Sequence, residues 1–77
     1  MKTYIVIIEA TDEEDTFERI QDFIYNEFPY LEDMELIEQY DNKYRCKLTT
    51  ENNFDYEIFE DGMYSVDYDT ELVAVYR

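Results

Sequence analysis

The sequence contains no histidine and has one glycine, one proline and one cysteine. Without histidine there is no imidazole base, and the single serine, Ser65, has no imidazole to activate it. One glycine excludes the P-loop and the dinucleotide-binding fingerprint, which need several glycines for close approach to phosphate. One cysteine excludes a thiolate zinc or iron–sulfur site. These absences predict that the chain is not an enzyme and binds no cofactor.

The chain also lacks signs of secretion or membrane insertion. Cys46 has no second cysteine to pair with, so we expect a buried thiol rather than a disulfide scaffold. The longest apolar run, Tyr4 to Ile8, is too short for a membrane span or a signal-peptide core. An anionic membrane would repel the chain. We therefore expect a cytoplasmic protein without a membrane partner.

Basic residues are scarce. Six Lys and Arg stand against 21 Asp and Glu, which gives a formal net charge of −15. A net charge of magnitude about 2–8 is enough to keep a small domain soluble, and a larger excess destabilises the fold by self-repulsion. The complement of a dense acidic surface is a basic one, and nucleic-acid-binding proteins have the densest basic surfaces. The composition predicts binding to a basic, nucleic-acid-binding protein, and not to nucleic acid itself.

The length and the apolar content predict one folded domain, residues 1–77. Hydrophobic residues make up 45% of the chain, with nine Tyr and five Phe. Disordered acidic tails are poor in aromatic and β-branched residues, so this chain does not belong with them. A domain of this size buries only about 60% of its unfolded surface, so its stability is marginal.

The first third of the chain predicts a strand followed by a helix. Residues 3–10 are β-branched, aromatic and almost continuously apolar, as in a central strand. Thr11 and Glu14 have the spacing of a capping box, and Pro29 stops a helix. We therefore expect one long helix over about 12–28. Its apolar residues fall on one face, at Phe17, Ile20, Ile24 and Phe28.

Residues 34–40 and 44–50 predict a hairpin. A three-residue turn at 41–43 would place Leu36 opposite Leu48, whereas a two-residue turn would mix the apolar and polar faces. We therefore expect the longer turn, which also places Tyr40 opposite Tyr44. The second strand would carry a basic stripe on its solvent-facing side, with internal pairing to Glu38 or neighbouring acids. The stripe consists of Lys43, Arg45 and Lys47.

The last third predicts a second helix or a further strand. Residues 52–60 fit a short helix closed by Gly62, but they also alternate as a strand does. Residues 64–68 and 72–76 have strand patterns, with a turn at 69–70. The expected fold is α+β, with a mostly antiparallel sheet of four to five strands backed by the long helix. If 52–60 is helical, the order βαββαβ is that of a ferredoxin-like fold.

Carboxylates are spread along the whole chain at spacings that resemble those of a phosphate backbone. Same-face acids on a strand lie about 6.6 Å apart, and i,i+4 acids on a helix about 5–6 Å apart. Tyrosine adds contact area at interfaces. Asp67-x-Asp69-x-Glu71 lacks the Gly and the distal Glu of an EF-hand, so we read it as a solvated strand face and expect no metal site. The candidates for partner binding are Asp15, Glu18, Asp22, Asp55, Glu57, Asp67, Asp69 and Glu71, with Tyr56 and Tyr68.

The small size, the acidic excess and the Tyr-plus-acid texture of NNFDYEIFEDGMYSVDYDTE resemble phage-encoded DNA-mimic inhibitors. The resemblance covers composition over the whole chain and no motif. It implies an inhibitor of restriction, CRISPR, BREX or repair enzymes that acts in the host cytoplasm, and it assigns no functional residue. The opening YIVIIEATDEEDTFERIQDFIYNEF is similar to the βα start of many small phage proteins.

Two other functions remain open at this point. One is a non-enzymatic adaptor or structural module that binds through a sheet edge or an aromatic patch, in which case salt would affect binding little. The other is a cation-binding protein, which calcium would stabilise more than matched ionic strength does. A homodimer fits either the inhibitor or the adaptor, because it buries additional apolar area.

Overall fold

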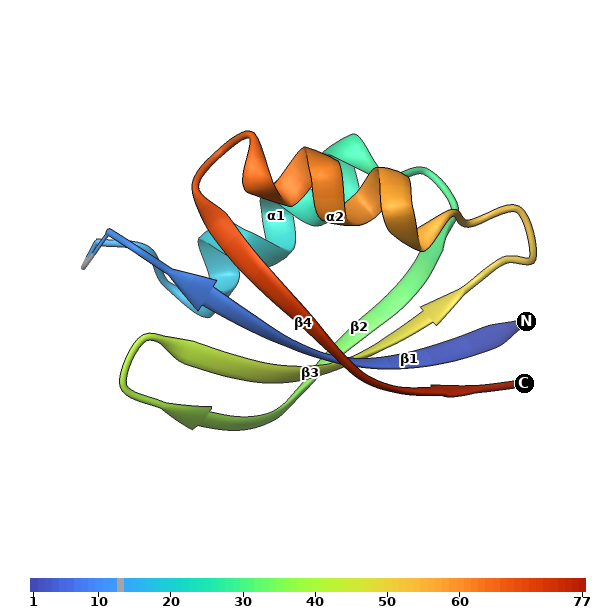
Figure 1. Ribbon diagram of the computed structural model, residues 1–77, viewed down its shortest axis with the longest axis horizontal. Helices are drawn as coiled ribbons and strands as arrows, with labels where there is room; N and C mark the ends of the chain where they lie inside the picture. Colours follow the sequence, from blue (N-terminus) through green and yellow to red (C-terminus); the bar gives the residue numbers. More distant parts are fainter. Residues whose placement is uncertain (13) are drawn as a thin grey trace.

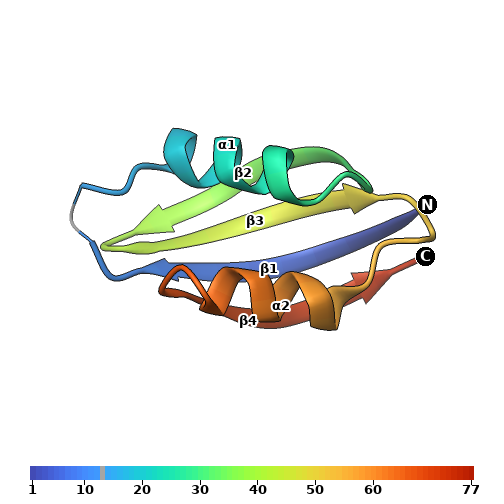
Figure 2. The ribbon, with the colours of Figure 1, turned by 90° about the horizontal axis from the view of Figure 1, so that it is seen from above.

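A computed structural model describes residues 1–12 and 14–77. The elements follow the order β1 (Lys2–Ala10), α1 (Phe17–Glu27), β2 (Leu31–Tyr40), β3 (Lys43–Thr50), α2 (Tyr56–Tyr64) and β4 (Tyr68–Tyr76). The strands form one four-stranded antiparallel sheet in the order β2-β3-β1-β4. Both helices lie on the same face of this sheet (Figure 1). Seen from above, α1 lies over β2 and β3, and α2 lies over β4 (Figure 2).

The central strand β1 explains the nearly continuous apolar run at the start of the chain. Tyr4, Val6 and Ile8 are buried against the helices, while Ile5 and Ile7 are half-buried on the other face of the sheet. β1 pairs with β3 on one side and with β4 on the other. β1 is therefore an inner strand whose one face lies under the helices, while Ile5 and Ile7 on the other face remain only half-buried.

The prediction of one long helix over about 12–28 is wrong. α1 has 11 residues and begins at Phe17. Thr16 is the N-cap, and its side chain accepts a hydrogen bond from the Arg19 backbone N–H at 3.3 Å. The helix ends at Glu27, immediately before the Phe28–Pro29 step, as proline requires. The helix therefore begins five residues later than the capping-box pattern indicated.

The expected capping box at Thr11 does not form, because the side chains before α1 make other hydrogen bonds. The Asp12 carboxylate accepts from the Glu14 backbone N–H at 2.9 Å, which closes a local turn. The Thr11 hydroxyl donates to the Asp67 carbonyl at 3.3 Å and so ties this loop to the start of β4. Glu13, which lay within the predicted helix, is outside the described residues.

The turn between β2 and β3 has two residues and not the three expected. Asp41 and Asn42 form it, and Tyr40 pairs with Lys43. Asp41 has a φ of 54°, in the left-handed region that Asp tolerates better than most residues. The Asn42 amide donates to the Ala10 carbonyl at 2.7 Å, which fixes the turn against the end of β1.

A register shift in β2 allows the short turn without mixing the two faces. The shift lies between Leu36 and Glu38, so Ile37 is an additional residue in the ladder. Leu36 pairs with Cys46, and the predicted pairing of Leu36 with Leu48 is wrong. This bulge returns Met34 and Leu36 to the face that the helices cover, and a second register shift, between Leu31 and Asp33, does the same for Leu31.

The second helix is present, but it occupies residues 56–64 and not 52–60. The strand predicted over 64–68 and the turn predicted at 69–70 are wrong. Ser65 donates its backbone N–H to the Asp61 carbonyl at 3.1 Å, so helical hydrogen bonding extends past Tyr64. A turn at 65–67 follows, in which Asp67 has a φ of 66°. β4 then runs without interruption to Tyr76, which gives four strands.

The core lies between the sheet and the helices and is rich in aromatic rings. The centroids of Phe28 and Phe59 are 4.9 Å apart, and Phe59 is fully buried. Gly62 permits this close packing, because a Cβ atom added there would lie 2.9 Å from Cζ of Phe28. The single glycine of the chain thus lies where α2 packs on the ring of Phe28, the residue after α1.

Cys46 is fully buried on β3. We expect its thiol to make the free energy of unfolding fall at high pH. Burial raises the pKa of its thiol from 9.0 to about 12. The folded state therefore holds the thiol proton over pH 9–12, where the unfolded state has lost it. The free energy of unfolding should fall by about 1.4 kcal/mol per pH unit in this window. Urea titrations at pH 8 to 11 measure this slope, and Cys46→Ala should reduce it.

Candidate functional site

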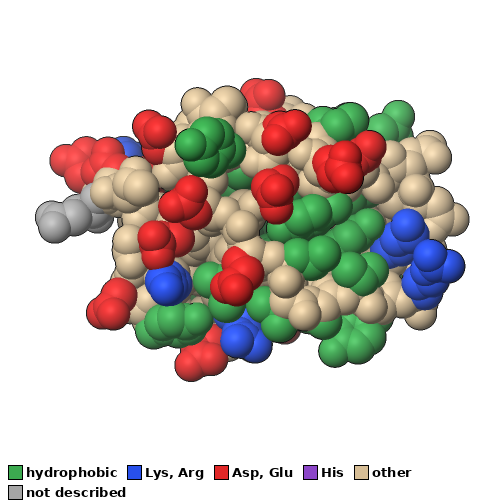
Figure 3. Space-filling view, in the orientation of Figure 1, with side chains coloured by type: hydrophobic (Ala, Val, Ile, Leu, Met, Phe, Trp, Pro, Cys, Tyr) green, Lys and Arg blue, Asp and Glu red, His purple; other side chains and the backbone are tan. Residues whose placement is uncertain are grey.

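Charge is distributed unevenly between the two faces of the molecule. We call the outer surface of α1, α2 and the loops that join them to β1 and β4 the helix-layer face. Arg19 is the one basic residue within this surface among the described residues. Figure 3 shows acidic side chains over α2 and over the loops at one end. The acids of the helix-layer face are Asp12, Glu14, Asp15, Glu18, Asp22, Glu27, Glu57, Glu60, Asp61 and Asp67.

Helical geometry brings several of these acids close together. Glu18 and Asp22 are exposed on α1 with an i,i+4 spacing, and Glu57 and Asp61 have the same spacing on α2. Such pairs lie about 5–6 Å apart at Cβ and destabilise a helix when their charges have the same sign. Neither helix carries a basic residue in its last turn, where a cation would be favourable. Like-charge repulsion within each helix is therefore not compensated, and replacing one acid of a pair by a neutral residue would remove it.

The two loops beside the helices bring distant acids together at one end of the molecule. Asp12, Glu14, Asp15 and Asp67 line a shallow depression of about 830 Å³. Burial raises the pKa of the nearby Tyr68 phenol, and the Asp15 carboxylate raises it further, whereas Arg19 lowers it. Asp15 raises this pKa because its negative charge disfavours the ionised phenolate, as a negative local potential does. Of the predicted acids, Asp15 and Asp67 thus meet across 52 positions of sequence.

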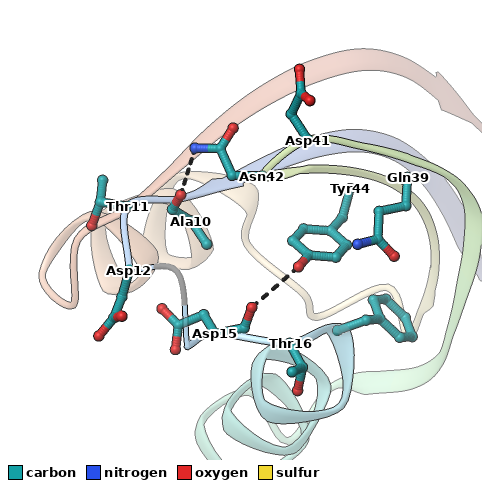
Figure 4. A pocket seen from close by; sticks show the side chains of 10 residues that line it. Ala10, Thr11, Asp12, Asp15, Thr16, Gln39, Asp41, Asn42 and Tyr44 are labelled. Atoms are coloured by element: carbon teal, nitrogen blue, oxygen red, sulfur yellow. Dashed lines mark hydrogen bonds between the residues drawn. The ribbon is translucent and has the colours of Figure 1, made fainter.

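A second depression, of about 740 Å³, lies between the loop after β1 and the β2–β3 turn (Figure 4). Asp12, Asp15 and Asp41 are among its lining residues. Two polar side chains in its wall already have partners, because the Tyr44 hydroxyl donates to the Asp15 carbonyl at 3.2 Å and the Asn42 amide donates to the Ala10 carbonyl. Within residues 1–12 and 14–77, no three His, Cys, Asp or Glu side chains are grouped so that they could hold a metal ion. The depression adds negative charge to this end of the molecule.

The two predicted tyrosines are not exposed contact residues. Tyr68 is 8% exposed and packs edge-on against Phe23, with centroids 6.0 Å apart. Tyr56 is half-buried and stacks on Tyr4 at 5.6 Å. A partner could therefore reach the Tyr56 side chain only in part, and that of Tyr68 hardly at all. The structure instead exposes Tyr64, which is 72% accessible at the end of α2 and which the sequence pattern had placed in a strand.

The predicted acids are divided between three locations. Five of them belong to the helix-layer face, namely Asp15, Glu18, Asp22, Glu57 and Asp67. Asp55 is the N-cap of α2 and accepts hydrogen bonds from the backbone N–H groups of Glu57 and Ile58 at 2.9 and 3.4 Å, so it has a structural task. Asp69 and Glu71 lie on β4. Alternation from the buried Tyr68 directs them to the face of the sheet that no helix covers, and the predicted set is therefore not one surface.

The basic stripe on β3 has acidic neighbours. Lys43 forms an ion pair with Glu9 on β1 at 3.6 Å, and not with Glu38. The ladder with β2 places Glu38 opposite Arg45 and Glu35 opposite Lys47. Exposed pairs of this kind contribute only about 0–1 kcal/mol each, but they make the uncovered face of the sheet mixed in charge. The acidic excess is therefore concentrated on the helix-layer face.

No protein-family model matches this chain. No curated protein and no solved structure matches it either. Neither helix in the described part of the chain is long and apolar enough to cross a membrane, since α1 has 11 residues and α2 has nine. Function must therefore be inferred from the surface itself.

Proposed function

We propose that this protein is a small acidic inhibitor that occupies the nucleic-acid-binding groove of a basic protein. The helix-layer face is the surface that enters the groove, in the place of a phosphate backbone. The resemblance in composition suggests a restriction, CRISPR, BREX or repair protein as the target. The protein performs no reaction and acts by excluding DNA or RNA.

The asymmetry of charge is the observation that carries this proposal. Ten acids stand on the helix-layer face with Arg19 as the one basic residue there, while Lys43, Arg45 and Lys47 lie on the sheet beside acidic neighbours. If the charge served solubility alone, it would need neither this magnitude nor this separation. A surface of one sign attracts a partner of the opposite sign and raises the rate of association.

The dimensions of the molecule suit the proposed role. The chain measures 33 × 22 × 18 Å along its principal axes. Its long axis corresponds to about ten base pairs at 3.4 Å per step. Figure 2 shows α1 over the β2 side of the sheet and α2 over the β4 side, and both helices carry exposed acids. A groove that accommodates a short stretch of duplex would therefore accommodate this domain.

Two variants with the same net charge test the proposal. The helix-layer variant neutralises Asp22, Glu27, Glu60 and Asp61 as amides. The sheet-edge variant neutralises the four acids of β2 in the same way, namely Glu32, Asp33, Glu35 and Glu38.

Each tagged variant is incubated with bacterial lysate, and the captured proteins are eluted with NaCl or with duplex DNA. We expect the wild type to retain a nucleic-acid-binding protein that either eluent releases. The helix-layer variant should retain at least about tenfold less of it, and the sheet-edge variant nearly as much as the wild type. Equal losses in the two variants, or a partner that resists both salt and DNA, would contradict charge mimicry.

A further inference from the structure

The two edges of the sheet differ in their protection against pairing with another strand. An edge strand presents unpaired backbone groups, and proteins usually guard it with charged side chains. The β2 edge carries four acids, Glu32, Asp33, Glu35 and Glu38. The C-terminal half of β4 carries none after Glu71. Its large apolar side chains, which are 40–60% exposed, are Leu72, Val73, Val75 and Tyr76.

The exposed residues of β4 form part of a larger apolar area. Figure 3 shows hydrophobic side chains gathered between α2 and the C-terminal half of β4. A bulge opposite Ile5 and Val6 leaves Val73 outside the pairing with β1, but the strand continues to Tyr76. No strand of the described residues lies beyond β4, so its outer backbone edge is available for a partner.

We propose that β4 pairs antiparallel with β4 of a second copy and thereby forms a continuous eight-stranded sheet. The charges at the two ends of the exposed segment select this partner. Glu71 precedes the apolar residues and Arg77 follows them, and both are exposed. Antiparallel pairing centred near Ala74 brings Glu71 of each copy opposite Arg77 of the other. Parallel pairing would instead place like charges together.

The same symmetry leaves part of the repelling charge away from the paired segment. A two-fold axis normal to the sheet places both helix layers on the same face, on either side of the joined β4 strands. Pairing near Ala74 involves residues 71–77 and leaves Asp69 outside the paired segment. Glu60 and Asp61, which line a depression with Asp69 at the first half of β4, stay beside the unpaired part of the strand. Tyr56, at the start of α2, stacks on Tyr4, which pairs with Val75, so its neighbours Asp55 and Glu57 are the helix-side acids nearest the paired segment.

Sedimentation of the full chain over a concentration series tests this pairing. We expect a dimer of twice 9.5 kDa whose dissociation constant falls as NaCl rises, because salt screens the repulsion between two chains of charge −15. Val75→Lys should raise the dissociation constant at least about tenfold. The control Ile37→Lys adds the same charge at a side chain that is 51% exposed on the opposite edge strand, and it should leave the dimer intact.

A charge swap tests the orientation of the pairing. Glu71→Arg reduces the net negative charge and would strengthen an unspecific association, yet we expect it to weaken the dimer. Arg77→Glu should weaken it too, and the double variant should restore it to within about threefold of the wild type. Circular dichroism and thermal melting establish that each variant is folded.

Two results would overturn the inference. One is a wild type that sediments as a monomer at every concentration and salt, and the other is a dimer that Val75→Lys leaves unchanged. These outcomes are separate from the fate of the proposed inhibitor function. Binding to a basic partner weakens with salt and depends on the helix-layer acids, whereas the dimer strengthens with salt and depends on β4.

Discussion

Phe59→Ala is expected to lower the free energy of unfolding by about 3–5 kcal/mol. Phe59 is fully buried, and its ring lies within 5.7 Å, centroid to centroid, of Phe28, Phe54 and Tyr56. This loss has two parts. One is the lost burial of the ring, and the other is the cost of the cavity that its neighbours cannot fill. Because a domain is stable by only about 5–15 kcal/mol, this loss removes a large part of the stability of the fold. Urea titration followed by circular dichroism measures the difference.

Ile58→Ala is the matched control for this experiment. Ile58 is adjacent on the same helix, but its side chain is 64% exposed. Its replacement should change the free energy of unfolding by no more than about 0.5 kcal/mol. If Phe59→Ala cost less than about 1 kcal/mol, or as little as Ile58→Ala, the aromatic layer beneath α2 would not be the core of the fold.

The helix-layer variant is expected to be more stable than the wild type, by about 1–3 kcal/mol. Replacing Asp22, Glu27, Glu60 and Asp61 by amides changes the net charge from −15 to −11, because four carboxylates are neutralised. Glu27 and Asp61 lie in the last turns of their helices, where negative charge opposes the helix dipole at about 0.3–1 kcal/mol each. The remaining gain comes from weaker repulsion across the helix-layer face. Thermal melting at low ionic strength measures the combined effect.

The salt dependence of the melting temperature separates the effect of charge repulsion from local effects of the substitutions. Between about 0.01 and 0.5 M NaCl, the melting temperature of the wild type should rise, because screening weakens like-charge repulsion. The melting temperature of the helix-layer variant should rise less over the same range of salt. The sheet-edge variant, with the same net charge, should gain less stability, because Glu35 and Glu38 face Lys47 and Arg45 across the ladder. A helix-layer variant less stable than the wild type would show that the acids support the fold.

A surface that is predicted to cost stability needs an explanation other than folding. Proteins commonly trade stability for function where the functional surface is strained or repulsive. The helix-layer face fits this description, because substitutions that stabilise the fold are also those expected to weaken the proposed binding. If one variant gains stability and loses binding, this identifies a binding surface more specifically than either effect alone.

The sequence predicts the central strand and the end of the first helix well, because strong local signals determine them. The apolar run of β1 and the stop at Pro29 need no tertiary information. The start of the helix was wrong because Thr11 and Thr16 both precede residues suited to a helix. The Thr16–Phe17 step places a capping residue directly before the first apolar residue, a signal that the sequence did contain. In the folded chain Thr16 caps the helix, while Thr11 donates to the Asp67 carbonyl.

The register of the hairpin depends on information that local patterns lack. A two-residue turn appears incompatible with the apolar residues of β2 until the bulge at Ile37 is known. Nothing in the residues around Ile37 marks a bulge, since its position reflects pairing with β3. In the same way, the segment after Tyr64 alternates as a strand does, yet the hydrogen bond from Ser65 to Asp61 prolongs the helical turn.

The candidate site was predictable in charge and not in arrangement. Composition indicates an acidic surface, and the helical spacing of Glu18 and Asp22 already indicates close pairs on one face. Topology was needed to separate Asp69 and Glu71 from that face. Tyr68 was misplaced because an aromatic residue beside acids has the same sequence pattern whether its ring is exposed or packs on Phe23.

The most direct test of the proposed function is whether a captured partner can hold this protein and DNA at the same time. A short labelled duplex is bound to the partner, and its fluorescence anisotropy is followed as the protein is added. We predict full displacement of the duplex, with a potency that falls steeply with NaCl and at least about tenfold in the helix-layer variant. A ternary complex in which the duplex remains bound while the protein associates would contradict the proposal.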